Sequence, residues 1–332
     1  MGTPVALAAF AGVLAVAAPR VLGRMSWLHD APRLGIAVWA SACVAFVFAV
    51  VGAGVTMTGP THLLVHGLHE LFHACADAVA GIHPDGPSRT IALAGVTAAG
   101  LAAGTAATGV VRSMWRGRCE HARHRWAADL VGRNTPVPDV VCLDVDEPAV
   151  YCLPGRPGRV VLTRGAVQAL EGPELAAALA HEREHLRSRH HVLLAVADGL
   201  ARVLPFVPLV RAARGELRYL VEVAADDAAV RRHGRRPLAR AIATVAAGAL
   251  PWRALGAGAA DVVTRVARLN AARRRPAWGA RAVVVAGCSV LVLLPVAATG
   301  GTLWRAAVED RCEHPLVAAT STSLASDHAH EH

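Results

Sequence analysis

The residues best suited to chemistry lie at positions 181–185, which read His-Glu-Arg-Glu-His. Residues four apart share one face of a helix, so His181 and His185 can present two imidazoles to the same ion. Imidazole nitrogens at about 2.0–2.1 Å are typical ligands of Zn²⁺. The spacing therefore predicts one Zn²⁺ per chain, held in part by these two histidines.

Glu182 follows the first histidine, and its place on the helix indicates a role in proton transfer. Adjacent helical residues are turned by about 100°, so this carboxylate can reach a water on the ion rather than the ion itself. Zinc lowers the pKa of such a water to about 7, and a nearby carboxylate can accept its proton. The expected outcome is a hydroxide directed at a peptide carbonyl. The alternative is a polar helix face with chance spacing, in a chain of 17 histidines.

A third ligand is expected from a second helix, because a catalytic zinc usually has three protein ligands and a water. The pattern over 218–231 predicts a helix that carries Glu222 and Asp226 four residues apart. We expect Glu222 to complete the metal site and Asp226 to fix the tautomer of a ligand histidine. The alternative is a pair of solvated acids that balance nearby arginines. Candidates for stabilising an oxyanion are His190, His191, Arg231 and His233, and none stands out.

Apolar stretches dominate much of the chain. It is 54% hydrophobic and 18% charged, with a mean hydropathy of +0.39, which argues against a purely soluble or disordered protein. A bilayer core of about 30 Å needs roughly 20 apolar residues in a helix. We therefore expect four transmembrane helices, the first of marginal length; the uncharged runs are 1–19, 34–59, 90–111 and 282–304.

The arginines predict an orientation, since positive residues stay on the cytoplasmic side. Segment 20–33 carries three arginines and segment 112–125 carries five, but segment 60–89 carries one. The expected layout has three transmembrane helices within 1–111, with an outer loop at 60–89. A cytoplasmic domain over 112–281, a fourth transmembrane helix at 282–304 and a short outer tail at 305–332 follow.

The insert between the third and fourth runs reads as an α+β domain. Three Val-rich segments predict strands, and a helix is expected from Gly172, with Pro173 and Glu174 in its first turn; the strand segments are 140–145, 149–153 and 159–163. We expect 159–163 to lie at a sheet edge and to pair with an extended substrate. The apolar segment 191–210 cannot cross the membrane once, because Glu222 would then lie opposite His181. It either packs on the domain, dips into the bilayer and returns, or lies at the interface, and we favour a helix that extends to the membrane surface with a turn near Pro205.

These motifs together carry a family resemblance. Glu174-Leu175, the motif at 181–185 and Glu222-x-x-x-Asp226 resemble the gluzincin peptidases embedded in membranes, above all the BlaR/MecR-type family. The resemblance covers the four apolar runs and residues from about 112 to 281. It implies an α-rich membrane protein with a zincin-like α+β catalytic domain between transmembrane helices three and four. In that family the two histidines and the later glutamate bind zinc.

The resemblance also implies a function and a location. By the same resemblance, Glu182 is the general base, and Asp226 orients the metal ligands without binding the metal itself. The implied protein is a zinc endopeptidase in the inner membrane of a bacterium, acting on a protein near its cytoplasmic face, such as a transcriptional repressor. Only about 28 residues follow Trp304, so we expect no penicillin-binding sensor domain and no β-lactam receptor role. The alternative is a non-catalytic signalling or scaffold protein, which would have no need of Glu182.

Other histidines, cysteines and arginine-rich runs give weaker predictions of metal sites, disulfides and binding partners. A second H-E-x-x-H occupies 69–73, and His62, His66, His69 and His73 share a helix face. The alternatives are a catalytic motif, an accessory metal or pH-sensitive patch, and an ordinary interfacial helix, which is favoured. Cys75 and Cys312 are the two cysteines expected outside, paired or free. The arginine-rich runs at 231–236 and 273–275 favour anionic lipid over nucleic acid. No nucleic acid partner is expected, and the sequence does not indicate an oligomeric state.

Overall fold

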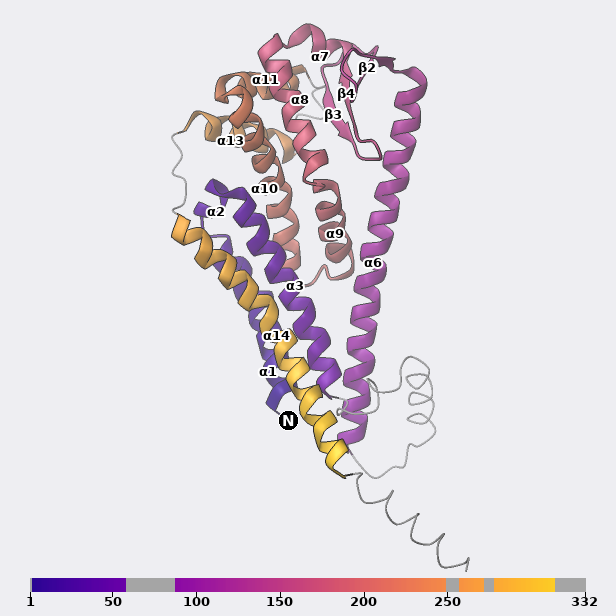
Figure 1. Cartoon of the computed structure of the whole chain (residues 1–332), viewed down its shortest axis with the longest axis vertical. Coiled ribbons are helices and arrows are strands. Elements are labelled where there is room, and N and C mark those ends of the chain that lie inside the picture. Colours follow the sequence, from indigo (N-terminus) through magenta and orange to yellow (C-terminus); the bar gives the residue numbers. More distant parts are fainter. Residues whose placement is uncertain (1, 58–86, 249–256, 272–277, 314–332) are drawn as a thin grey trace, which may run out of the picture. The chain divides into compact units, whose positions relative to one another are not determined.

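The computed structural model describes residues 2–57, 87–248, 257–271 and 278–313 (Figure 1). Long helices dominate these ranges: α1 (Gly2–Leu22), α3 (Pro32–Met57), α6 (Pro87–Val131) and α14 (Trp278–Glu313), with the short α2 (Trp27–Asp30) between the first two. Three segments are long and apolar enough to cross a membrane: Gly2–Leu22, Pro32–Thr56 and Gly279–Arg305. The expected span at 90–111 falls within the continuous helix α6, and it stays a prediction.

The chain divides into two compact units. The first comprises Met1–Leu14, Val44–Gly104 and Ser289–His332, and the second comprises Ala15–Cys43 and Thr105–Cys288. In the first unit, a Cβ added at Gly52 would collide with Thr299 and crowd Leu7. Small residues at such contacts let apolar helices approach closely. The predicted domain boundaries at 111, 281 and 304 stay predictions.

The second unit contains a four-stranded sheet. Its strands are β1 (Arg133–Asn134), β2 (Val140–Leu143), β3 (Val150–Leu153) and β4 (Arg159–Thr163). The order is β1-β2-β4-β3, with β2 and β4 parallel and the other pairs antiparallel. The three predicted strands are confirmed, although the first ends at Leu143 rather than at residue 145 and the second begins at Val150 rather than at residue 149. The two exposed residues of β1 carry no apolar pattern that could have indicated a strand.

The expectation that residues 159–163 form a sheet edge is wrong. Strand β4 pairs with β2 on one side and β3 on the other, so both of its edges are occupied by the protein itself. Its central residues Val160, Val161 and Leu162 are all buried. A continuous apolar run of this kind is typical of a strand covered on both faces, whereas alternation marks a half-exposed one. The two edges of the sheet are β1 and β3, and β3 is the edge strand beside β4.

Between the sheet and α14, the described residues form six helices: α7 (Arg164–Ala169), α8 (Gly172–Arg187), α9 (His190–Val203), α10 (Pro208–His233), α11 (Arg235–Gly248) and α13 (Ala257–Asn270). Helix α8 lies between the sheet and helices α10 and α11 (Figure 1). One of its faces packs Leu179 against Val140, Val160 and Leu162 of the sheet. The opposite face packs small Ala177 and Ala180 against Ala229 and Leu238. The small side chains let α8 and α10 approach closely.

The ends of these helices follow local signals. Helix α8 begins with Pro173 in its first turn, and the Glu174 carboxylate accepts a 3.2 Å hydrogen bond from the Glu171 N–H. Helix α9 ends at Val203 and α10 begins at Pro208, which confirms the predicted turn near Pro205. Neither helix is among the three membrane-length segments found in the described ranges. No span found there therefore separates His181 from Glu222.

Candidate metal centre

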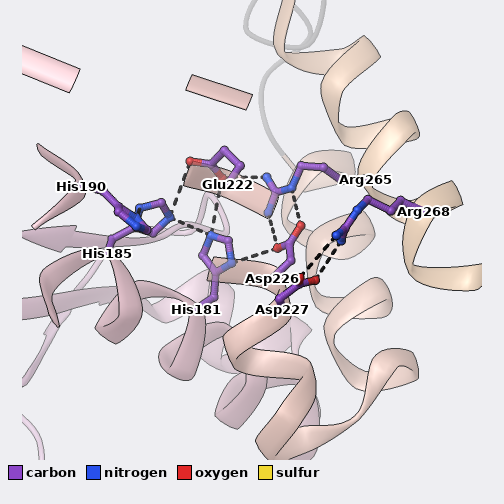
Figure 2. A network of polar contacts seen from close by, with 8 residues as sticks. All are labelled: His181, His185, His190, Glu222, Asp226, Asp227, Arg265 and Arg268. Carbon is purple, nitrogen blue, oxygen red and sulfur yellow. Dashed lines mark hydrogen bonds and ion pairs between the residues drawn. The ribbon is translucent and has the colours of Figure 1, made fainter. Parts of the chain in front are cut away.

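Helices α8 and α10 bring His181, His185 and Glu222 together (Figure 2). One nitrogen or oxygen atom from each residue lies within 4.8 Å of the other two. The Nε2 atoms of the histidines are 3.1 Å apart, and the Glu222 oxygens lie 3.5 and 3.6 Å from them. Ligand atoms on a tetrahedral zinc with bonds of 2.0–2.1 Å lie about 3.3 Å apart. The three side chains thus have the spacing of three corners around one such ion.

The other ring nitrogens of both histidines face protein groups. Nδ1 of His181 lies 3.0 Å from Oδ1 of Asp226, whose side chain is 1% exposed, although the approach is oblique for a hydrogen bond. Nδ1 of His185 lies 3.0 Å from Nδ1 of His190. Both rings are therefore engaged at Nδ1 and turn Nε2 into the shared space, which is the arrangement that suits metal ligands.

His190 reaches His185 because the chain reverses sharply between α8 and α9. Arg189 adopts a left-handed conformation with φ of +50°, the only such residue other than glycine among the described ones. The bend stacks the His190 ring edge-on against the His185 ring, with 4.9 Å between ring centres. Left-handed backbone is strained for a residue with a side chain, so surrounding contacts must maintain it.

Arg265 on α13 is part of the site, although sequence reasoning missed it. Its guanidinium donates to both oxygens of Asp226 at 2.6 and 2.8 Å and lies 2.9 Å from Oε2 of Glu222 (Figure 2). Its side chain is only 11% exposed. Arg265 is one of 34 arginines and lies 39 residues beyond Asp226, so nothing in the sequence marks it as a residue of the site. Arg265 neutralises the acids and fixes how Glu222 faces the histidines.

Glu182 lies on the side of α8 that faces the sheet edge. Burial raises its pKa, while the neighbouring His181 lowers it. The Cys152 thiol of β3 is hydrogen-bonded to this carboxylate, and burial also raises the pKa of that thiol. A carboxylate with a raised pKa is a stronger base near neutral pH. Cys152 was missed as a neighbour because the sequence offers no motif that links it to the helix.

The charges of the three candidate metal ligands depend strongly on one another. Burial alone would lower the pKa of His181, but Asp226 and Glu222 outweigh it and raise the pKa to about 10. Burial lowers the pKa of His185 to about 4 despite the nearby Glu222. Burial alone would raise the pKa of Glu222, but His181 and Arg265 lower it to about 2. His185 is therefore neutral and Glu222 ionised at neutral pH, as metal ligands must be, whereas His181 is protonated and must release its proton when a metal binds.

Arg183 and Glu184, two of the three residues between the histidines of the motif, anchor α8. Arg183 donates two 2.6 Å hydrogen bonds to the Asp139 carboxylate, which stands just before β2. Glu184 is 3% exposed and accepts hydrogen bonds from Arg33 of α3 at 2.9 Å and from Ser188 at 2.8 Å. The motif thus holds its helix against both the sheet and the start of α3.

The remaining candidates from the sequence are not brought into the group. The ring of His191 faces that of His121, and Arg231 lines a separate cavity. His233 lies at the last residue of α10. The second H-E-x-x-H at 69–73, the histidine face at 62–73 and Cys75 lie outside the described residues, as does the side chain of Cys312. Their predictions stay untested.

Comparison with known families supplies the classification. The family model described as BlaR1 peptidase M56 matches residues 96–265, which are 170 of the 332 residues. The chain belongs to this family. The match contains the sheet, α8 and α10, and it extends to Arg265. The family consists of membrane metallopeptidases, and the three apolar helices agree with a membrane protein. No curated protein and no solved structure matched the chain.

Proposed function

We propose that this protein is a zinc-dependent endopeptidase of the membrane. The observation that carries the proposal is the convergence of two Nε2 atoms and one carboxylate from different helices at the spacing of zinc ligands. His181, His185 and Glu222 would hold the ion, and Asp226 would orient His181. Bound zinc would polarise the peptide carbonyl and lower the pKa of the attacking water.

The protein's own acid-base chemistry would rest on Glu182. Its carboxylate accepts a proton from the attacking water and then delivers it to the amine that leaves the cleaved peptide bond. Its partly buried position and raised pKa support both halves of this transfer. The Cys152 thiol holds the carboxylate on the sheet side of α8, where a substrate strand would lie.

The edge strand β3 is the proposed substrate platform. Within the described part of the chain β3 pairs with β4 alone, and it packs against α8. An extended peptide could continue the sheet beyond β3 through main-chain hydrogen bonds, which would pass it alongside Glu182. This assigns to β3 the role that the sequence had suggested for residues 159–163.

The cellular setting remains part of the proposal. The arginine-rich segments 20–33 and 112–125 support a cytoplasmic catalytic domain under the positive-inside rule. The substrate would then be a protein at the inner face of a bacterial plasma membrane, with a regulatory protein such as a repressor as one class.

One observation favours a non-catalytic alternative. Arg265 already occupies Oε2 of Glu222, and its positive charge opposes the binding of a second cation. In a non-catalytic scaffold with this fold, the Arg265 guanidinium would neutralise Glu222 and Asp226 in place of a zinc ion. Glu182 argues against this alternative, because burying its carboxylate beside Cys152 is unfavourable and no ion pair with a described residue offsets it, an arrangement that a scaffold does not need.

The test is hydrolysis by the full chain in detergent, with casein and self-cleavage as substrates. We expect cleavage that stops with chelator, returns with Zn²⁺ and is lost in Glu182→Gln. Glu216→Gln on α10 is the matched control, since Glu216 bonds His29 rather than the metal group. Chelator-insensitive cleavage, or equal cleavage by Glu182→Gln, would overturn the proposal. Protein that takes up no zinc and cleaves neither substrate would favour the scaffold.

A further inference from the structure

A second site lies in the same compact unit but away from the metal group. A cavity of about 440 Å³ is lined by the loop before α3, the start of α3 and residues from α10, α11, α13 and α14. This volume is within the usual range of pockets for small ligands. None of the residues that line it belongs to the metal group.

The wall of the cavity is strongly basic. Its lining contains four arginines and two acids, namely Arg33, Arg231, Arg235, Arg281, Asp30 and Asp227. Asp227 is already bonded to Arg268 outside the lining, at 2.9 Å. The lining of the cavity therefore carries more positive than negative charge, which favours the binding of an anion.

Three of the arginines keep donors available for a ligand. Arg231 and Arg281 make no ion pair with any residue that the structure describes, and both are exposed. Arg235 donates to the backbone oxygen of Ala271 at 2.8 Å and has no acidic partner in that same part of the chain. Planar guanidinium groups bind phosphate oxygens in pairs, so such a set is suited to a phosphate group.

The loop that forms one wall is held in place. The His29 ring lies 3.0 Å from the Glu216 carboxylate of α10, and Arg268 donates to the His29 carbonyl oxygen at 3.1 Å. A Cβ added at Gly35 would lie 2.9 Å from the Leu28 carbonyl oxygen and 3.1 Å from the Leu220 side chain. The cavity is therefore built from well-packed elements.

The cavity lies where two apolar helices begin. Arg33 is the second residue of the membrane-length segment Pro32–Thr56, and Arg281 is the third residue of Gly279–Arg305. The first turn of a spanning helix lies at the level of the lipid headgroups. Trp27, the first residue of α2 and 37% exposed, is a residue type enriched at that level.

We propose that this cavity binds the phosphate-bearing headgroup of an anionic phospholipid. Arg231, Arg235 and Arg281 hold the phosphate, and the apolar lining residues Leu34 and Leu269 contact the glycerol and the first carbons of the acyl chains. Basic pockets beside membrane helices recognise such headgroups. Free phosphate would bind the same arginines, but it has no acyl chains to contact the neighbouring apolar helices.

The experiment measures lipid binding by the full chain in a neutral detergent, by native mass spectrometry and thermal shift. The probes are phosphatidylglycerol, phosphatidylcholine and inorganic phosphate. We expect retention of phosphatidylglycerol and a rise in melting temperature with it alone. Arg231→Ala and Arg281→Ala should each weaken binding about fivefold, the usual effect of one basic residue at an anionic surface. Arg232→Ala is the control, because this exposed neighbour does not line the cavity.

Each other outcome is decisive. Equal retention of phosphatidylcholine, or equal weakening by Arg232→Ala, would mean that the cavity does not select an anionic headgroup. Stabilisation by inorganic phosphate at the same concentration as the lipid would make it a site for free phosphate. Zinc content serves as the independent check on folding, and it should be unchanged in all three variants.

Discussion

Replacement of Arg265 by alanine should destabilise the protein strongly. The Asp226 side chain is 1% exposed and that of Arg265 is 11% exposed, so the variant leaves a carboxylate buried without its main partner. Loss of one member of a buried ion pair costs about 3–5 kcal/mol, whereas exposed pairs contribute about 0–1 kcal/mol. The two hydrogen bonds of 2.6 and 2.8 Å place this pair in the first class.

The assay is chemical unfolding of the full chain in detergent, followed by tryptophan fluorescence. Arg265→Ala should lower the unfolding free energy by about 3 kcal/mol or more. Arg240→Ala on α11, an exposed arginine, should change it by less than about 0.5 kcal/mol. The double variant Arg265→Ala/Asp226→Ala should lose less than the two single variants summed, because the unpaired charge is then absent. Equal effects of Arg265→Ala and Arg240→Ala would refute the assignment of a buried, coupled pair.

Three further outcomes follow from other contacts. Asp198 is 16% exposed, and although burial raises its pKa, hydrogen bonds from Arg218 and a second arginine of α10 lower the pKa below its usual value. Asp198→Asn should therefore lower the free energy of unfolding by about 1–2 kcal/mol at pH 7, a range that allows for solvent around the half-exposed arginines. In unfolding titrations, the difference between the variant and wild type should vanish as the pH falls below about 4. His190→Ala should weaken zinc binding about 10–100-fold in chelator competition, because His185 loses the group at its Nδ1, while His191→Ala should leave it unchanged. Ala229→Leu should overpack the contact between α8 and α10 and lower the free energy of unfolding by about 1–3 kcal/mol, with a parallel loss of bound zinc. Full zinc content in a destabilised variant would show that the site does not depend on the close approach of the two helices.

The local parts of the site could be predicted because helical spacing alone determines them. Residues four apart on one helix must share a face, so the pairing of His181 with His185 needed no knowledge of the rest of the fold. The strands at 140–143, 150–153 and 159–163 were also readable, because Val-rich segments alternate there with Pro and Gly.

The long-range parts could not be predicted, because nothing local encodes them. Arg265 reaches Asp226 only through the packing of α13, and the anchoring of Glu184 by Arg33 joins residues 151 positions apart. The order of strands in the sheet depends on a parallel pairing of β2 with β4 that leaves β3 at the edge. The buried run Val160–Leu162 carried a signal for a central strand, but it was interpreted as an edge.

The central claim is that α8 and α10 together hold one zinc ion, and metal analysis of purified variants tests it most directly. Wild type and Glu182→Gln should each bind about one zinc per chain, as should Glu216→Ala, which removes a carboxylate from the same helix as Glu222. His181→Ala and Glu222→Ala should fall below about one tenth of that content. Near-stoichiometric zinc in Glu222→Ala, with His181→Ala also unchanged, would contradict the two-helix site.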